Sequence, residues 1–167
     1  MRTQATLLLP YLGLASDLRR SLDPEMSSTM GPHVTIIYDD EAPDADLLSK
    51  RLISICRTTA PIDLHLEVIK PFQPKETGLY VSVKANASFF AIRSKALTPP
   101  FRSRYFSFEP HVTILHPKSP INDRVNWMQH IGTPIRVSLT IQEISVVSYD
   151  GSKWNKVAAM PLVGAAT

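Results

Sequence analysis

One pentapeptide occurs twice in the chain, as Pro-His-Val-Thr-Ile at 32–36 and again at 110–114. It places His33 two residues before Thr35 and, 78 residues further on, His111 two residues before Thr113. Residues i and i+2 of a strand project from the same face, so each copy presents an imidazole and a hydroxyl together. The valine and isoleucine side chains then point to the opposite, apolar face. Two such pairs facing each other across a pseudo-twofold axis would make one four-residue site.

This set of side chains suits phosphodiester chemistry. One neutral imidazole takes the proton of an attacking water or hydroxyl, and the other, as imidazolium, protonates the departing sugar oxygen. Histidine titrates near neutrality, so both protonation states are accessible at once. The hydroxyls of Thr35 and Thr113 can donate hydrogen bonds to the non-bridging oxygens as charge develops there, a role that needs no metal. The pseudo-symmetry leaves open whether His33 or His111 is the base.

The elements that must position these residues repeat as well. The first half predicts a strand at 6–9, a helix at 12–22 ended by Asp23 and Pro24, the motif strand at 33–38, a helix at 45–57 capped by the acidic loop 39–44, and a hairpin of strands 62–68 and 79–83. The second half predicts a helix at 88–97, the motif strand at 109–115, a helix at 122–131, an alternating segment at 135–148 and, after an Asp150-Gly151 turn, a closing strand at 154–160. This mixture predicts an α+β fold with largely antiparallel sheets.

Composition limits the class of protein. With 167 residues, 44% of them hydrophobic and 20% charged, the chain predicts one globular domain over residues 1–167. The net charge of +3 slightly favours an anionic ligand, but no basic run indicates a duplex-binding arm. Cys56, the single cysteine, falls in an apolar helical pattern and predicts a buried thiol. Without a signal peptide or a bilayer-length apolar segment, we expect a cytoplasmic protein with no membrane partner.

The paired motifs His33-Val34-Thr35-Ile36 and His111-Val112-Thr113-Ile114 resemble those of the 2H phosphoesterase superfamily, which includes 2'-5' RNA ligase-like proteins and cyclic nucleotide phosphodiesterases. The resemblance in element order extends from the strand at Thr6 to the strand near Met160. It implies a bilobal, duplicated fold in which two antiparallel sheets line a central cleft, with the helices outside. It also implies catalysis by His33, Thr35, His111 and Thr113 without metal or cofactor, on a nucleotide or RNA end that carries a 2',3'-cyclic phosphate, a 2'-5' linkage or a related cyclic diester.

Substrate-binding residues are expected near the motifs. Many family members have a basic residue five positions after the motif histidine, where this chain has Tyr38 and His116. An aromatic ring at the first position suits base stacking, and His116 suits phosphate binding. Further candidates are Tyr149 and Trp154 for stacking, and Arg102 and Arg104 as a basic lip over the cleft.

Several alternatives stay open. Each histidine could be a strand-end residue satisfied by a local hydrogen bond, although packing does not require the same polar pair twice. The chain could be a catalytically silent nucleotide- or RNA-binding module that uses the same cleft. A histidine metal site is disfavoured because the motifs supply too few ligands. Among enzymatic roles, RNA end processing competes with hydrolysis of cyclic nucleotide signals. We expect a monomer.

Overall fold

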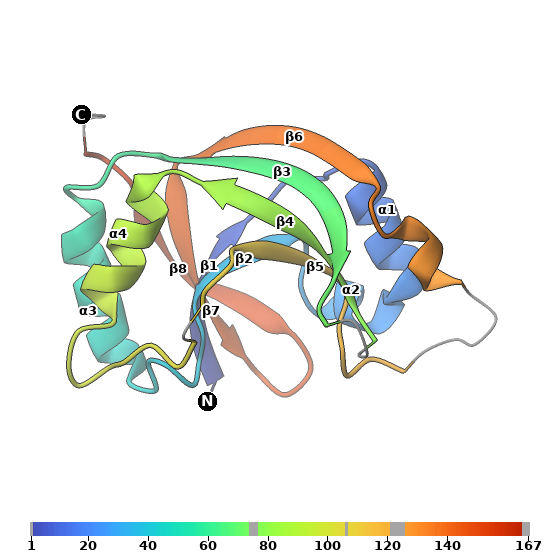
Figure 1. The fold of residues 1–167 in the computed structure, drawn as a ribbon. Coiled ribbons are helices and arrows are strands. Elements are labelled where there is room, and N and C mark those ends of the chain that lie inside the picture. The colour runs from blue at the N-terminus through green and yellow to red at the C-terminus, as the bar shows by residue number, and fades with distance from the viewer. Residues whose placement is uncertain (1, 74–76, 106, 121–125, 165–167) are drawn as a thin grey trace.

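A computed structural model describes residues 2–73, 77–105, 107–120 and 126–164. Its strands form two four-stranded antiparallel sheets, one of order β2-β1-β7-β8 and one of order β5-β4-β3-β6 (Figure 1). The first sheet contains β1 (Arg2–Leu8), β2 (His33–Ile37), β7 (Glu143–Tyr149) and β8 (Trp154–Pro161). The second contains β3 (Ile62–Pro71), β4 (Leu79–Ala85), β5 (His111–Leu115) and β6 (Pro134–Ile141). The α+β architecture with two antiparallel sheets is therefore confirmed.

The two motif strands, β2 and β5, pair with their neighbouring strands in the same way. The paired residues are Leu8 with His33 and Thr6 with Thr35 in the first sheet, and Ser82 with His111 and Tyr80 with Thr113 in the second. Immediately after each threonine pair the register shifts by one residue, which leaves Ile36 and Ile114 as the extra residues. Such a bulge increases the local twist of a strand and redirects its side chains. The pseudo-twofold relation expected from the repeated pentapeptide is thus present in the hydrogen-bond ladders.

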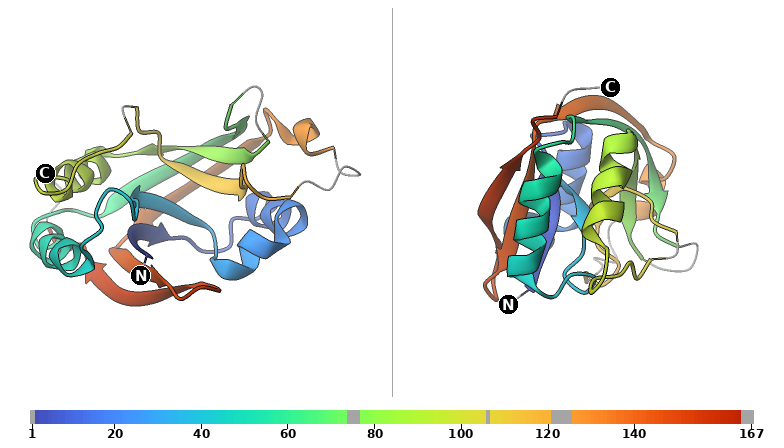
Figure 2. Two further views of the ribbon diagram at one scale, coloured as in Figure 1. Left: turned by 90° about the horizontal axis from the view of Figure 1, so that it is seen from below. Right: turned by 90° about the vertical axis from the view of Figure 1, so that its left-hand side faces the viewer.

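Helices lie in pairs at the two ends of the sheets (Figure 2). One pair is α1 (Leu14–Leu22) with α2 (Pro24–Thr29), and the other is α3 (Ala45–Cys56) with α4 (Ala87–Ala96). The predicted cap of α3 is confirmed, since Asp44 accepts a hydrogen bond from the amide of Leu47 at 2.9 Å. Asp23 and Pro24 end α1 as expected, but they also begin α2: Asp23 caps it through the amide of Met26, and proline suits the first helical position.

The alternating segment at 135–148 is not one strand. It divides at Gln142 into β6, which pairs with β3 in the second sheet, and β7, which pairs with β1 in the first. The two strands differ in burial, since β6 is half-buried on one face whereas β7 is buried on both. The apolar positions also change phase at the break, from Leu139 and Ile141 to Ile144 and Val146, so the single alternating segment was a wrong interpretation of the pattern. The closing hairpin of β7 and β8 is confirmed. Of the helix predicted at 122–131, residues 122–125 lie outside the described part, and a 3₁₀ helix, η1, spans Trp127–His130.

One hydrophobic cluster joins the two sheets. β2 and β5 are in contact, and the faces of these strands that carry Val34, Ile36, Val112 and Ile114 are buried. The predicted burial of Cys56 is confirmed, and this burial raises the pKa of its thiol to about 11. Among the residues that the structure describes, no helix is long and apolar enough to cross a membrane.

Candidate active site

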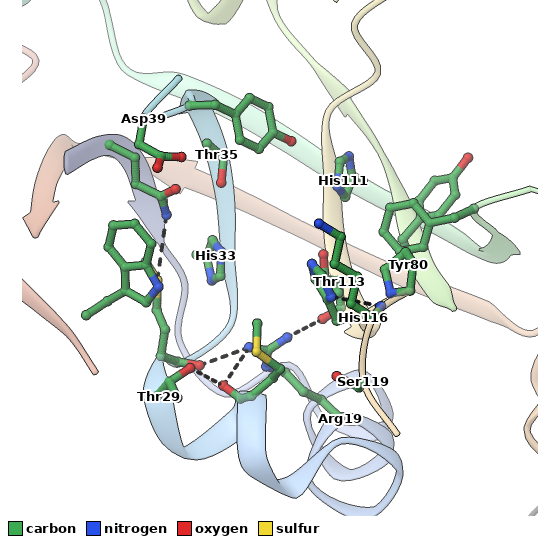
Figure 3. A pocket seen from close by; sticks show the side chains of 18 of the residues that line it. Arg19, Thr29, His33, Thr35, Asp39, Tyr80, His111, Thr113, His116 and Ser119 are labelled. Atoms are coloured by element: carbon green, nitrogen blue, oxygen red, sulfur yellow. Dashed lines mark hydrogen bonds between the residues drawn. The ribbon is translucent and has the colours of Figure 1, made fainter. Parts of the chain in front are cut away.

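A cavity of about 870 Å³ is lined by residues of both sheets, α1 and α2. His33 and Thr35 reach it from β2, and His111 and Thr113 reach it from β5 (Figure 3). The alternation of the motif strands explains this placement, because the intervening valines and isoleucines occupy the core on the opposite face. The structure therefore brings the two predicted polar pairs to one cavity.

Both histidine rings are held by the same local hydrogen bond. Nδ1 of His33 lies 2.8 Å from the carbonyl oxygen of Gly31, and Nδ1 of His111 lies 2.9 Å from that of Glu109. A carbonyl oxygen can only accept, so Nδ1 carries the proton in each ring. Nε2 is then free to take a proton from substrate or, in the imidazolium, to donate one. Each histidine thus makes the local hydrogen bond that the structural alternative expects. The same bond fixes the proton at Nδ1 and leaves Nε2 for acid-base chemistry.

The surroundings of His33 favour its neutral form. Burial lowers the pKa of His33 to about 4, against the raising effect of the hydrogen bond to Gly31. The positive charges of Arg19 and of the facing His111 contribute to this lowering. At neutral pH the ring is therefore a neutral imidazole, with its proton on Nδ1, whose Nε2 can accept a second proton.

His111 has a different environment. The rings of Phe72 and Tyr80 lie edge-on to it, each with its centroid 5.3 Å from that of the imidazole. Burial lowers the pKa of His111, but both the hydrogen bond to the Glu109 carbonyl and the Glu109 carboxylate raise it. The same carboxylate accepts hydrogen bonds from Tyr80 and Lys70, each at 3.2 Å. A negative charge thus supports protonation of His111, whereas a positive charge opposes protonation of His33.

The motif threonines offer two hydroxyls to the cavity. Thr35 is 8% exposed, and Thr113 is half-buried. Within the described part of the chain, neither side chain makes a hydrogen bond to protein, although both residues line the cavity. Each hydroxyl can therefore donate to an oxygen of a bound group.

Tyr38 and His116, at equivalent positions after the two motifs, both line the cavity. The Tyr38 ring packs against Tyr105 with a centroid distance of 4.8 Å, and burial raises the pKa of its phenol. The backbone amide of His116 donates to Asp23 at 2.9 Å, and its Nδ1 accepts from the amide of Lys118 at 3.1 Å. That bond leaves Nε2 of His116 as the ring nitrogen free for a ligand.

Tyr149 and Trp154 lie next to Arg2 at the ends of neighbouring strands of the first sheet. The Arg2 guanidinium lies 5.7 Å from the centroid of Tyr149 and 5.5 Å from that of Trp154, within the range of cation–π contacts. Its Nε also donates to Asp39 at 2.7 Å. All four residues line the cavity, so this group forms an aromatic and charged wall.

Arg102 and Arg104, expected as a basic lip, are exposed and do not line the cavity. The Arg104 guanidinium lies 3.9 Å from the carboxylate of Asp40. The basic residues that do line the cavity are Arg2, Arg19 and Lys118. Within the described ranges, no three His, Cys, Asp or Glu side chains gather closely enough to hold a metal ion.

Sequence reasoning missed several lining residues, and some had a detectable signal. Leu79, Val81 and Val83 mark one face of β4, so Tyr80 must share the opposite face with the motif residues of the neighbouring strand. No comparable signal exists for Arg19, which lies on a surface-like helix with charged neighbours but is buried.

The fold and the site together define a class: a duplicated α+β protein in which each half contributes one imidazole and one hydroxyl to a shared cavity. Comparison with known proteins identifies the family. The model of the 2'-5' RNA ligase superfamily matches residues 12–153, and the chain belongs to this superfamily.

Relatives and solved structures agree with this assignment. The chain is 29% identical over 106 residues to a Bacillus cytotoxicus protein and 30% identical over 103 residues to one from Bacillus cereus strain B4264, both named provisionally as phosphoesterases. Each alignment covers 60% of this chain and 59% of the relative. A protein of Thermus thermophilus shares the fold with a TM-score of 0.71 at 15% identity, over 98% of this chain and 99% of that one. E. coli LigT complexed with 3'-AMP has a TM-score of 0.58 at 13% identity, over 96% and 97%.

Proposed function

We propose that this protein is a metal-independent phosphodiesterase that hydrolyses a 2',3'-cyclic phosphate, a 2'-5' linkage or a cyclic (di)nucleotide by acid-base catalysis between His33 and His111. One observation carries the proposal: the two imidazole-hydroxyl pairs come from different sheets yet line one cavity, and each ring has its Nδ1 engaged and its Nε2 free. Membership in the 2'-5' RNA ligase superfamily supports the same chemistry. Because each half supplies one histidine, we treat the two lobes as one functional domain.

The electrostatic difference between the histidines supports one assignment of roles in hydrolysis, with His33 as the base and His111 as the acid. His33, held neutral, accepts a proton from water at Nε2 as the water oxygen bonds to phosphorus. The bond from phosphorus to the departing sugar oxygen breaks, and His111 donates the Nε2 proton of its imidazolium to that oxygen. The hydroxyls of Thr35 and Thr113 donate hydrogen bonds to the non-bridging oxygens, where negative charge accumulates. The product keeps the phosphate on one sugar oxygen, with a hydroxyl on the other.

The cavity wall suits the rest of a nucleotide. Its volume of about 870 Å³ lies in the range of small-molecule sites. Tyr38, Tyr149 and Trp154 supply aromatic faces for a base, and His116 supplies a ring nitrogen for a phosphate oxygen. E. coli LigT has been crystallised with 3'-AMP and with ATP, which supports a nucleotide ligand here. Arg102 and Arg104 lie outside the lining, so they would contact only a substrate that extends beyond the cavity.

A product-resolved screen of the purified protein in a strong chelator tests the proposal. The substrates are 2',3'-cyclic mononucleotides, 2'-5' and 3'-5' oligonucleotides, and cyclic dinucleotides. We expect hydrolysis of at least one 2',3'-cyclic, 2'-5' or cyclic dinucleotide bond, lost in His33→Ala and His111→Ala but kept in His65→Ala, whose exposed ring bonds to Ser138 away from the cavity. Tight nucleotide binding without product would instead identify a silent binding module.

A further inference from the structure

Two buried arginines occupy related places in the two halves. Arg19 on α1 and Arg93 on α4 are 2% and 6% exposed. Each guanidinium crosses to the motif strand of the other sheet: Nη1 of Arg19 donates to the Thr113 carbonyl at 2.6 Å, and Nη1 of Arg93 donates to the Ile36 carbonyl at 2.5 Å. The pseudo-symmetry therefore extends from the motifs to one buried cation in each half.

The charge of Arg93 is neutralised within the protein. Its two terminal nitrogens donate to the two carboxylate oxygens of Glu41, at 2.8 and 2.5 Å. The side chains of Arg93 and Glu41 are 7% and 0% exposed, so this bidentate ion pair is buried. The guanidinium also lies 3.8 Å from the centroid of Phe108. Arg93 therefore links α4 to the loop that follows β2 and has a structural role.

Arg19 has no such partner. Besides the Thr113 carbonyl, its hydrogen-bond acceptors among the residues that the structure describes are the carbonyls of Met26 and Met30, at 3.2 and 3.0 Å. These acceptors are all neutral, and Nε makes no hydrogen bond within the described residues. In that same part of the chain, no carboxylate lies within 4.0 Å of the guanidinium, so Arg19 forms no ion pair.

The nearby carboxylate of Asp23 is committed elsewhere. One oxygen accepts from the amide of Met26, and the other accepts from the amide of His116 and the hydroxyl of Ser119. Burial lowers the pKa of Arg19, and Asp23 offsets this only in part, but a guanidinium stays protonated in proteins. The chain thus keeps a cation out of water without an ion-pair partner, an arrangement that is costly unless a ligand supplies the opposite charge.

The cavity is where that ligand would bind. Arg19 lines it together with both motif histidines and both motif threonines, and Figure 3 shows its guanidinium beside Thr113 and below His33. We propose that Arg19 is a further substrate-binding residue, whose guanidinium binds the negative charge of the substrate phosphate from the α1 side of the cavity. This inference rests on the proposed function. Arg19 lies outside both motifs in the sequence. Its guanidinium would supply the positive charge that is missing five positions after each motif histidine, where this chain has Tyr38 and His116.

Nuclear magnetic resonance of the wild-type protein tests this assignment without a mutation. Inorganic phosphate is titrated while the side-chain Nε–H signals of Arg19 and Arg93 and the ring signals of His33 and His111 are followed. We expect the Arg19 and histidine signals to shift along one binding curve, whereas the Arg93 signal stays in place. Histidine shifts without an Arg19 shift would overturn the role of Arg19 and leave the proposed function intact. Absence of any shift would contradict both.

Matched variants measure the size of the effect. Arg19→Met should weaken inorganic phosphate binding by about tenfold or more, because it removes a charge-assisted partner. Arg19→Lys keeps the charge but not the planar guanidinium, so its affinity for inorganic phosphate should lie between those of the wild-type protein and Arg19→Met. Arg20→Met is the control, since Arg20 is the neighbouring residue and its exposed side chain pairs with Asp17. Thermal unfolding monitored by circular dichroism confirms that each variant is folded. Equal phosphate affinity in folded Arg19→Met and Arg20→Met would refute the proposal.

Discussion

The two halves share a backbone plan and differ in their charges. Each half presents a histidine with the same Nδ1 hydrogen bond, the same register at its threonine and a buried arginine that reaches across to the other half. In the first half His33 faces the positive charge of Arg19, whereas in the second His111 lies beside the Glu109 carboxylate. The duplicated fold places the groups symmetrically, and in the proposed mechanism the asymmetry of charge makes His33 the base and His111 the acid.

The same comparison separates structure from ligand binding among the buried charges. Arg93 has Glu41 as its counter-ion, so its charge is satisfied when the cavity is empty. Within the described ranges of the chain, Arg19 is hydrogen-bonded only to neutral carbonyls. One buried cation therefore contributes to the stability of the fold, and the other is available to an anion.

The largest expected effect comes from removing the charge of Glu41. Glu41→Gln leaves Arg93 buried without a counter-ion, and breaking such a pair costs about 3–5 kcal/mol of unfolding free energy. Denaturant unfolding followed by circular dichroism measures the loss. Glu67→Gln is the control, because the Glu67 pair with Lys84 is exposed, and we expect little change. Equal stability of the two variants would contradict the structural role given to Arg93.

The motif threonines provide the next test. Thr35→Val and Thr113→Val keep the shape of the side chain but remove the hydroxyl, and each should lower kcat by about 10²-fold if it stabilises charge in the transition state. Steady-state kinetics on the substrate found in the screen measures this. Thr140→Val, whose hydroxyl bonds to Asp63 on the outer part of the second sheet, should leave kcat unchanged. A loss in only one motif variant would show that the electrostatic asymmetry extends to the hydroxyls.

A smaller effect is expected from pH. Activity requires neutral His33 and protonated His111, so kcat/KM should rise as pH passes about 4, where His33 loses its proton. It should fall as His111 loses its proton, at a pKa below the ordinary 6.5. The pH–rate profile should therefore have its maximum on the acidic side of pH 6.5. A maximum well above pH 7 would contradict the assigned roles.

The sequence predicted the two motif strands, the antiparallel α+β class and the meeting of the two polar pairs, because the repeated pentapeptide and period-two alternation are local signals, but it did not predict α2. The sequence marks the break at Gln142 only by a change of phase in the apolar positions, from Leu139 and Ile141 to Ile144 and Val146, and does not show that β6 and β7 belong to different sheets. It also did not reveal Arg19, whose hydrogen bonds to the carbonyls of Met30 and Thr113 depend on how α1 packs against β5. Contacts of this kind arise only when the two halves are assembled.

The most direct test of the central claim, that two imidazoles act on one phosphorus atom, is a double-mutant comparison in chelator. Each of His33→Ala and His111→Ala should lower kcat by about 10²- to 10⁴-fold. Because the two groups act in one step, the double variant should be scarcely less active than the worse single variant. Losses that multiply, with each single variant keeping a large share of activity, would show that the histidines act independently and would contradict the account.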